Sequence, residues 1–429
     1  MHPLHGLYLD LSDKGPGRES VEHGSLFPPR QVHCLRALHT GLSLSGHGNP
    51  LLGLVSYKAE KIVKEKVVVA MSGGVDSSFT AFLLKEKGYD VIGATMRIWR
   101  DDCGEASGSL EGCSGTKNVE DAGRVARQLG IPFHVIDLSA DFDREVVRYF
   151  CREYARGRTP NPCVHCNEKV KFGAFMTRAN DLGARYLATG HYARIALEEK
   201  GGRYLLKKGK DASKDQSYVL FTLSQAQLGR VLFPLGEYEK KQVRLKAQEI
   251  GLPVYNKPES QEICFIQEDS YHPFLKSRLG EAIEPGPIWD GHGNLLGRHK
   301  GIAFYTIGQR KGLGLATGKA LYVTGIDAAR NALIVGEERD VLGDLFNVDS
   351  VRWIVPPEGD GIVKAEVKIR YNHPGAEATL TPRGNDEWVV KFTSPQKAIT
   401  PGQAAVFYQE ETVLGGGWIR EVVRSSGSA

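Results

Sequence analysis

Residues 67–78 read Val-Val-Val-Ala-Met-Ser-Gly-Gly-Val-Asp-Ser-Ser, and this stretch decides the fold. Its first four residues form a continuous apolar run, which is typical of a strand buried on both faces. Two glycines then allow a tight turn, and an apolar-periodic segment that predicts a helix continues through Leu84. The stretch therefore predicts a strand, a glycine-rich turn and a helix in direct succession.

The same alternation continues along the chain. Further strands are predicted at 90–98, 133–137 and 186–189, and further helices at 118–129, 141–154 and 169–182. Strands and helices that alternate with short connections indicate an α/β fold with a doubly wound parallel sheet. Ligands bind such sheets at the carboxyl ends of the strands, so the glycine-rich turn is the expected binding site.

The pattern changes after about residue 260, where Pro and Gly become more frequent. Residues 361–371 alternate between apolar and charged side chains, and short strands are predicted at 387–392 and 404–408. Short strands separated by Pro and Gly turns suit a small closed barrel. We expect an N-terminal extension at 1–60, an α/β domain at 61–260, a central domain at 261–345 and a C-terminal β-barrel at 346–429.

The extension at 1–60 holds six of the 13 His residues and shows no helical or strand period, so we predict no ordered structure for it. One interpretation is a transit peptide, which the acidic residues Asp10, Asp13, Glu19 and Glu22 oppose. The favoured interpretation is a start site assigned too far upstream, with the functional chain beginning near 55–66.

Composition excludes several classes of protein. The chain has 429 residues, of which 41% are hydrophobic and 25% charged, as in globular proteins. Its net charge of +4 is too small to indicate nucleic-acid binding by itself, but local basic stretches at 207–214, 298–300, 310–311 and 364–370 suit RNA phosphates. No apolar run approaches the roughly 20 residues that cross a bilayer, so we expect a cytoplasmic protein with no membrane partner.

The glycine-rich turn has the chemistry of a phosphate site. Consecutive glycines let backbone N–H groups close on an anion, the helix N-terminus adds partial positive charge, and Ser72, Ser77 and Ser78 supply hydroxyl groups. The Lys-Ser/Thr pair of a Walker loop is missing. The turn is therefore predicted to bind phosphate in another manner.

Seven cysteines form neither a disulfide framework nor a zinc-ribbon pattern. Cys163 and Cys166 precede a predicted helix, whose N-terminus should lower a thiol pKa, so at least one is expected to be a thiolate that serves as nucleophile or ligand. Cys264 lies between apolar residues and would alone be an inert thiol, but beside that pair it is a candidate sulfur carrier. No chemical role is expected for the other four, Cys34, Cys103, Cys113 and Cys151.

These features resemble the tRNA-specific 2-thiouridylase family over nearly all of residues 66–423. The strings that carry the resemblance lie at 72–78, 157–162, 167–172, 188–192, 214–218, 263–266, 306–314 and 401–403. The resemblance implies a catalytic domain like the adenine nucleotide α-hydrolases with a pyrophosphatase loop, a central tRNA-binding domain and a C-terminal β-barrel. It further implies ATP-dependent conversion of the wobble uridine of tRNA to 2-thiouridine.

The resemblance also implies residue roles. ATP with Mg²⁺ would be bound by Ala70, Met71, Ser72, Gly73, Gly74, Val75, Asp76, Ser77, Met96 and Gly190, with Asp76 helping to position the metal. The target base would contact Asn161, Pro162 and Cys163. The rest of the tRNA would contact His191, Lys214, Asp215, Gln216, Arg370, Tyr371 and Gln403.

In the implied reaction, ATP adenylates the uracil oxygen and sulfur then displaces AMP. Cys264 would carry the sulfur as a persulfide, supplied by an upstream sulfur carrier or cysteine desulfurase. Cys166 would be the nucleophile, which either releases the sulfur as sulfide or attacks the base itself. Both routes end in a Cys166–Cys264 disulfide.

One position departs from the family pattern. Cys163 stands where the common form has Asp, and it could replace a general base only after ionising. Cys163, Cys166 and Cys264 could instead ligate three irons of a [4Fe-4S] cluster, leaving the fourth iron open to carry a hydrosulfide. We expect the cluster in this variant, with a cluster-free persulfide route as the alternative.

Two other classes of protein remain open at this point. An ammonia-transferring ligase with the same ATP loop would need no paired cysteines. A non-catalytic tRNA-binding protein would keep the basic surfaces without the complete loop at 72–78.

Overall fold

The computed structural model describes residues 64–99, 114–199, 201–259, 263–266, 270–359, 361–384 and 386–423. They all lie in one unit of the chain, residues 48–429. The extension predicted at 1–60, with Cys34, lies outside the described residues, as do Cys103 and Cys113.

The first sheet has five parallel strands in the order β3-β2-β1-β4-β7. The strands are β1 (Lys66–Ala70), β2 (Asp90–Arg97), β3 (Phe133–Asp137), β4 (Tyr186–Ala188) and β7 (Val231–Leu232). The apolar run at 67–69 in β1 is fully buried, as its sequence predicts. The doubly wound parallel sheet is confirmed, and its strand order changes direction between β1 and β4.

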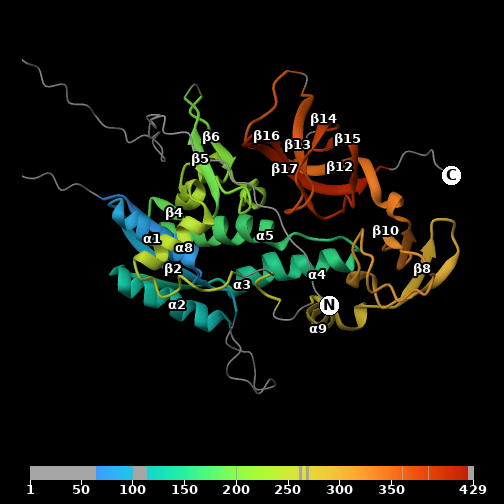
Figure 1. Cartoon of the computed structure of the whole chain (residues 1–429), viewed down its shortest axis with the longest axis horizontal. Coiled ribbons are helices and arrows are strands. Elements are labelled where there is room, and N and C mark those ends of the chain that lie inside the picture. The colour runs from blue at the N-terminus through green and yellow to red at the C-terminus, as the bar shows by residue number, and fades with distance from the viewer. Residues whose placement is uncertain are drawn as a thin grey trace, which may run out of the picture. The chain divides into compact units, whose positions relative to one another are not determined.

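Helices cover this sheet. α1 (Val75–Glu86) packs on β1 and β2 and also touches α2 (Ser114–Leu129) and α8 (Lys240–Glu249), which lies beside α1 in Figure 1. Between β3 and β4 the chain passes through α3 (Ser139–Phe142), η1 (Asp143–Val147), α4 (Arg148–Ala155), α5 (Pro162–His165), η2 (Cys166–Phe175) and α6 (Met176–Asp181). The helices predicted at 141–154 and 169–182 are thus present. Each includes a π-helical segment, η1 or η2, and such segments occur often at functional sites.

Shorter elements follow the first sheet. The sequence reasoning placed no strand between 190 and 260, but the structure has a hairpin of β5 (Ala193–Leu197) and β6 (Tyr204–Lys208) there. The helical turns are η3 (Ser217–Leu220), α7 (Gln225–Leu228), η4 (Pro234–Glu237), α9 (His272–Leu279), η5 (Gly280–Ala282), η6 (Ile302–Phe304) and η7 (Glu338–Val341).

A four-stranded sheet follows, in the order β10-β11-β8-β9. Its strands are β8 (Gly286–Asp290), β9 (Leu295–His299), β10 (Tyr322–Asp327) and β11 (Ala332–Gly336). Buried Ile288, Val323, Leu333 and Val335 give it a small core of its own. A separate core is what an additional folded domain requires.

The C-terminal strands close into a barrel in the order β12-β15-β14-β13-β16-β17, because β17 pairs back onto β12. They are β12 (Leu342–Trp353), β13 (Val363–Lys368), β14 (Ala376–Pro382), β15 (Trp388–Lys397), β16 (Ala404–Gln409) and β17 (Thr412–Val422). The predicted closed barrel is confirmed. The β5–β6 hairpin extends its sheet, since Lys207 of β6 pairs with Thr412 of β17.

One apolar cluster joins the barrel to the first domain. Val406 and Tyr408 of β16 are buried in the same cluster as Val68 of β1 and Phe150 of α4. The described part of the chain contains no helix with the length and apolar character needed to span a membrane.

Candidate active site

The glycine-rich turn follows β1 at the point where the strand order changes direction. Gly73 has a φ of +71°, and a Cβ there would lie 2.3 Å from the Asn118 carbonyl oxygen, so only glycine fits. The Ser72 amide donates to the Ser77 hydroxyl oxygen at 3.1 Å, and the Ser78 hydroxyl donates to the Gly74 carbonyl at 2.8 Å. The turn is therefore fixed by its own hydrogen bonds before any phosphate enters.

The end of β4 closes on this turn. A Cβ at Gly190 would lie 2.9 Å from atoms of both Asp76 and Ser77. The structure thus brings together the predicted ATP residues 70–77 and Gly190, which are more than 100 positions apart in sequence. Met96 is half-buried near the end of β2 and packs against the main core cluster.

A buried lysine that the sequence reasoning missed neutralises the turn's acidic residue. The Lys240 Nζ lies 2.8 and 2.6 Å from the two carboxylate oxygens of Asp76, and Lys240 is only 7% exposed. The Tyr192 hydroxyl donates to Asp76 at 2.8 Å. Burial and the neighbouring Asp76 carboxylate raise the pKa of Tyr192 far above its usual value, so this phenol stays a donor.

A second lysine holds the backbone of the turn. The Lys257 Nζ donates to the Gly73 carbonyl at 3.0 Å, to the Asn118 Oδ1 at 2.7 Å and to the Asp121 carboxylate at 2.5 Å. Lys240 and Lys257 place two ammonium groups at a turn whose chemistry suits phosphate. Lys240 lies on a helix rich in charged residues, and Lys257 follows it in a loop, so neither position suggests a site residue by its local sequence.

Glu259 links several of these cations. Its carboxylate lies 2.8 Å from Lys214 Nζ, 3.1 Å from Lys240 Nζ and 3.5 Å from an Arg244 nitrogen. Burial alone would raise the pKa of Glu259. Hydrogen bonds from Lys214 and Lys240 outweigh this effect and hold that pKa down to about 2. Glu259 is therefore an anion that fixes the geometry of the lysines around the turn.

The segment predicted to touch tRNA at 214–216 is engaged within the protein. Lys214 pairs with Glu259, and the Gln216 Oε1 accepts from the Tyr192 amide at 3.0 Å. Asp215 accepts from the Gly209 amide at 3.0 Å and from the Ser217 hydroxyl at 2.9 Å. These contacts support the walls of the site.

The paired cysteines lie on the short helix α5 and the start of η2. The Asn161 side chain caps α5 by accepting from the Val164 amide at 3.3 Å, and Pro162 is its first residue. Cys163 reaches the surface and Cys166 is half-buried. Both are free thiols, as are Cys264 and the buried Cys151.

The prediction of a thiol with a lowered pKa is wrong for this structure. Cys163 and Cys264 are both exposed in part to solvent, but protein atoms packed around the sulfurs remove much of their hydration. This desolvation raises the pKa of Cys163 and Cys166, and it raises that of Cys264 to about 12 with further contributions from the other two thiols. α5 has only four residues, so loss of water around the sulfurs outweighs the helix N-terminus. The prediction used only the helix N-terminus next to the cysteines, whereas the loss of water around each sulfur depends on segments far apart in the chain.

Lys171 opposes this effect. Its charge lowers the pKa of Cys163, Cys166 and Cys264, and it also acts on His191, next to Gly190. Cys166 and Ile263, the residue before Cys264, pack against the same apolar cluster as Met96 and Ala70, which precedes the turn. The cysteine segments and the strands that lead to the predicted ATP residues therefore share one core.

The other predicted tRNA residues lie at the edge of the site. His191 is buried between Phe172 and Phe233, and burial holds its pKa well below the usual value, so it is neutral here. Arg370 donates to the Lys397 carbonyl at 3.0 Å. Tyr371 is exposed. The Gln403 amide donates to the Thr159 and Pro160 carbonyls at 3.0 and 3.1 Å.

No group of three or more His, Cys, Asp or Glu side chains within the described ranges is arranged to hold a metal ion. The three thiols therefore do not form a site for a single metal ion in the described residues, and the iron–sulfur cluster stays a prediction.

A parallel sheet whose first strand ends in a glycine-rich turn beside two lysines defines a nucleotide-binding α/β protein of the HUP class, here with two added β domains. Residues 65–268 match the family model described as a tRNA methyl transferase HUP domain. Residues 272–337 match a tRNA methyl transferase PRC-barrel domain, and residues 343–419 an aminomethyltransferase beta-barrel domain.

Relatives that match this chain over almost their whole length identify the family within this class. The chain is 51% identical over 362 residues to tRNA-specific 2-thiouridylase MnmA 1 of Caldanaerobacter subterraneus subsp. tengcongensis, covering 84% of this chain and 100% of that protein. It is 49% identical to tRNA-specific 2-thiouridylase MnmA of Natranaerobius thermophilus, covering 83% and 98%. The chain belongs to the tRNA-specific 2-thiouridylase family.

Solved structures show more distant likeness. A 4-thiouridine synthetase in complex with RNA and ATP is 19% identical, with a TM-score of 0.30 and 51% of each chain covered. NMN synthetase from Francisella tularensis is 13% identical, with a TM-score of 0.30, and the match covers 52% of this chain and 79% of that one.

Proposed function

We propose that this chain converts the wobble uridine of tRNA to 2-thiouridine, using ATP and releasing AMP and pyrophosphate. Membership of the 2-thiouridylase family supports the substrate. The observation that carries the chemistry is the shared packing of Cys166 and Ile263, next to Cys264, with Ala70, which precedes the turn. The charge of Lys171 also lowers the pKa of all three thiols. A ligase that transfers ammonia has no use for such thiols, and neither has a protein that only binds tRNA.

The first step activates the base. The uracil 2-oxygen attacks the α-phosphorus of ATP, an O–P bond forms, and pyrophosphate leaves. Backbone N–H groups of the turn at 72–77 and the N-terminus of α1 stabilise the developing negative charge, with Lys240 and Lys257 nearby as cations. The adenylated oxygen then becomes a good leaving group, which an unmodified uracil carbonyl lacks.

The second step transfers sulfur. The terminal sulfur of a Cys264 persulfide bonds to C2 of the base, and AMP leaves with the C–O electrons. The Cys166 thiolate then attacks the Cys264 Sγ, so that 2-thiouridine departs and a Cys166–Cys264 disulfide forms. The transferred sulfur is reduced by two electrons and the two thiols are oxidised by two. In the alternative order, Cys166 attacks first and releases sulfide, which then attacks C2. Either order needs an external thiol reductant that supplies two electrons to reduce the disulfide to two thiols. An upstream sulfur carrier or cysteine desulfurase must then reload Cys264 with persulfide sulfur.

The proposed reaction uses Mg²⁺ with ATP and does not require iron. Mg²⁺ would neutralise the ATP phosphates, and Asp76 is the carboxylate at the turn, but in this structure Lys240 and Tyr192 occupy its oxygens. We derive no step through an iron–sulfur cluster and propose the cluster-free persulfide route. Iron and acid-labile sulfide assays after anaerobic purification test this, because activity that depends on bound iron would favour the cluster.

The tRNA would approach from the side where the cysteines open to solvent. Exposed Cys163 and Tyr371, with Asn161 and Pro162 beside them, are proposed to receive the flipped wobble base. Arg370 and Gln403 would contact the rest of the tRNA. Cys163 would orient the base through its thiol, since its raised pKa disfavours the thiolate needed for a general base.

The decisive test is thiolation of a wobble-uridine tRNA with ATP and a persulfide donor. Wild type should form 2-thiouridine and release pyrophosphate only when tRNA is present, and Cys264→Ser should release pyrophosphate without forming 2-thiouridine. Full activity in Cys264→Ser would indicate a ligase of another kind. Absence of tRNA-dependent pyrophosphate release would indicate a binding protein. Cys163→Asp in the same assay shows whether the thiol at 163 is needed.

A further inference from the structure

His165, the residue between Val164 and Cys166, contacts aromatic rings from two domains. The Tyr149 ring of α4 stacks on it at a centroid distance of 3.6 Å, and the Trp418 ring of β17 stacks on it at 4.8 Å. Both interplanar angles are about 30°. Because His165 belongs to the Cys163–Cys166 turn, a barrel residue thus fixes the direction of the segment that carries the two thiols.

The sequence of β17 permits this close approach. Gly415, Gly416 and Gly417 directly precede Trp418. A Cβ at Gly416 would lie 2.8 Å from the Phe221 ring of the first domain and 2.7 Å from the Ala405 carbonyl oxygen. A larger residue there would separate the barrel from the first domain and withdraw Trp418 from His165. The glycines therefore suit a contact that must be tight.

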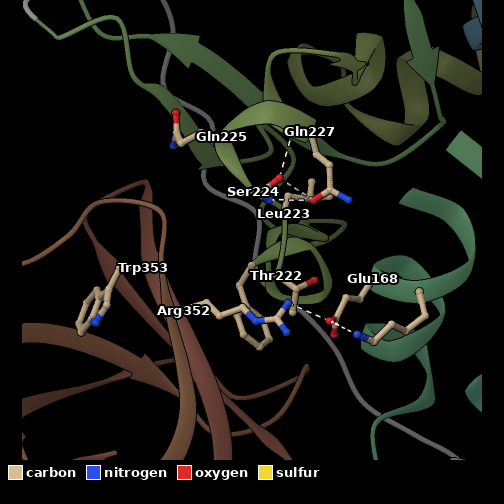
Figure 2. A pocket seen from close by; sticks show the side chains of 10 residues that line it. Glu168, Thr222, Leu223, Ser224, Gln225, Gln227, Arg352 and Trp353 are labelled. Atoms are coloured by element: carbon tan, nitrogen blue, oxygen red, sulfur yellow. Dashed lines mark hydrogen bonds and ion pairs between the residues drawn. The ribbon is translucent and has the colours of Figure 1, made fainter. Parts of the chain in front are cut away.

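The barrel also holds the segment on the other side of Cys166. The Arg352 guanidinium of β12 donates to the Glu168 carboxylate at 2.8 Å. Both residues line a pocket of about 550 Å³ between η2 and the barrel (Figure 2). Glu168 is two residues after Cys166, and Lys169 shares its carboxylate at 2.8 Å. These two cations hold the pKa of Glu168 below its usual value, so the ion pair persists at neutral pH.

Upstream of the cysteines the barrel makes a third contact. The Thr159 amide donates to the Pro401 carbonyl at 2.9 Å, and Gln403 returns hydrogen bonds to Thr159 and Pro160. The barrel therefore touches the segment before Cys163, between the two cysteines and after Cys166. A surface that served tRNA alone would not need to grip the catalytic segment at three points.

We propose that Trp418 and Arg352 are positioning residues, through which the C-terminal barrel holds the Cys163–Cys166 turn in place for sulfur transfer. The inference rests on the proposed function and assigns the barrel a role in the second step. Neither residue contacts the glycine-rich turn, so the adenylation step should not depend on them. Their loss should uncouple the two steps: pyrophosphate is still released, but less sulfur reaches the base.

The experiment measures pyrophosphate and 2-thiouridine in the same reaction of the full chain with saturating tRNA. Arg352→Ala and Trp418→Ala are compared with the conservative variants Arg352→Lys and Trp418→Phe. Arg420→Ala is the matched control, since Arg420 is a half-exposed barrel arginine whose partner, Glu387, also lies in the barrel at 2.7 Å. Alkylation of Cys166, followed by mass spectrometry without tRNA, reports the turn directly, and thermal melting reports the fold.

We expect 2-thiouridine per pyrophosphate to fall at least tenfold in Trp418→Ala and about threefold in Arg352→Ala. Trp418→Phe and Arg352→Lys should recover most of the loss, Arg420→Ala should match wild type, and the Cys166 alkylation rate should change only in the two alanine variants. An unchanged ratio and alkylation rate, or an equal loss of both products with intact folding, overturns the inference. If Trp418→Ala does not fold, Arg352→Ala and Trp418→Phe decide it. If wild type makes no 2-thiouridine, the proposed function fails, and the alkylation rates still decide whether the barrel positions the turn.

Discussion

The high pKa of Cys264 predicts that this thiol reacts slowly with alkylating reagents near neutral pH. Although Cys264 is exposed in part to solvent, desolvation of its sulfur by the surrounding protein and the neighbouring thiols of Cys166 and Cys163 raise the pKa from 9.0 to about 12. At pH 8 a pKa of 9 leaves about one thiol in ten ionised, whereas a pKa of 12 leaves about one in 10⁴. The reactive fraction therefore falls by about 10³ relative to an ordinary cysteine.

Nucleophilicity offsets part of this loss. A thiolate of higher pKa reacts faster, with a Brønsted slope of about 0.4–0.5, so three pKa units give roughly 15- to 30-fold. Cys264 should accordingly react with iodoacetamide about 30- to 60-fold more slowly at pH 8 than an ordinary thiol. Its rate should continue to rise with pH well beyond 9.

The assay is site-resolved alkylation of reduced, metal-free protein, with mass spectrometry of the Cys264 peptide between pH 6 and 11. The same peptide in urea is the internal control, because unfolding should return its midpoint to about 9. A native profile that coincides with the urea profile would refute the argument that burial suppresses this thiol. A midpoint below 9 would show that nearby positive charge outweighs the desolvation of this thiol.

Three further predictions concern the same site. Glu259→Gln should lower stability at pH 7 by about 1–3 kcal/mol and flatten its acid dependence in denaturant titrations, because the depressed pKa of Glu259 stabilises the fold above its usual 4.5 and that stabilisation is lost as pH falls toward 2; an unaltered acid profile would contradict this. Lys171→Met should shift the alkylation profile of Cys166 to higher pH, since the Lys171 charge lowers that pKa; the reasoning fails if the profile stays in place. Gly190→Ala, whose Cβ would lie 2.9 Å from Asp76, should weaken ATP binding about tenfold by calorimetry, whereas Gly291→Ala, with open space around it, should not; equal affinity in both variants would count against the predicted contact.

The first domain was predictable because its signals are local. The apolar run at 67–69, the glycines of the turn and the alternation of strands and helices each depend on neighbouring residues. The closed barrel followed in the same way from period-two alternation and turn residues. The β5–β6 hairpin was not predicted, and its pairing with β17 joins positions about 200 residues apart.

The cations of the site were missed for a physical reason. Lys240 begins a helix rich in charged residues, and nothing local distinguishes it from the exposed lysine beside it. Its burial arises from packing of α8 against α1, and its partner Asp76 lies 164 positions earlier. The prediction of a lowered thiol pKa was wrong for a similar reason. A helix N-terminus can be predicted from sequence, whereas the loss of water around a sulfur depends on the tertiary packing.

The stack of Trp418 on His165 has a consequence for synthesis of the chain. A ribosome adding about 5–20 residues per second needs roughly 13–50 s to travel from one residue to the other. During that interval the two cysteines have left the ribosome without the ring, the guanidinium and the amide that will hold them. A chain that terminates before β17 therefore has all the proposed ATP and sulfur-transfer residues but lacks Trp418, which contacts the cysteine segment. Sulfur transfer should accordingly require synthesis of the chain through β17.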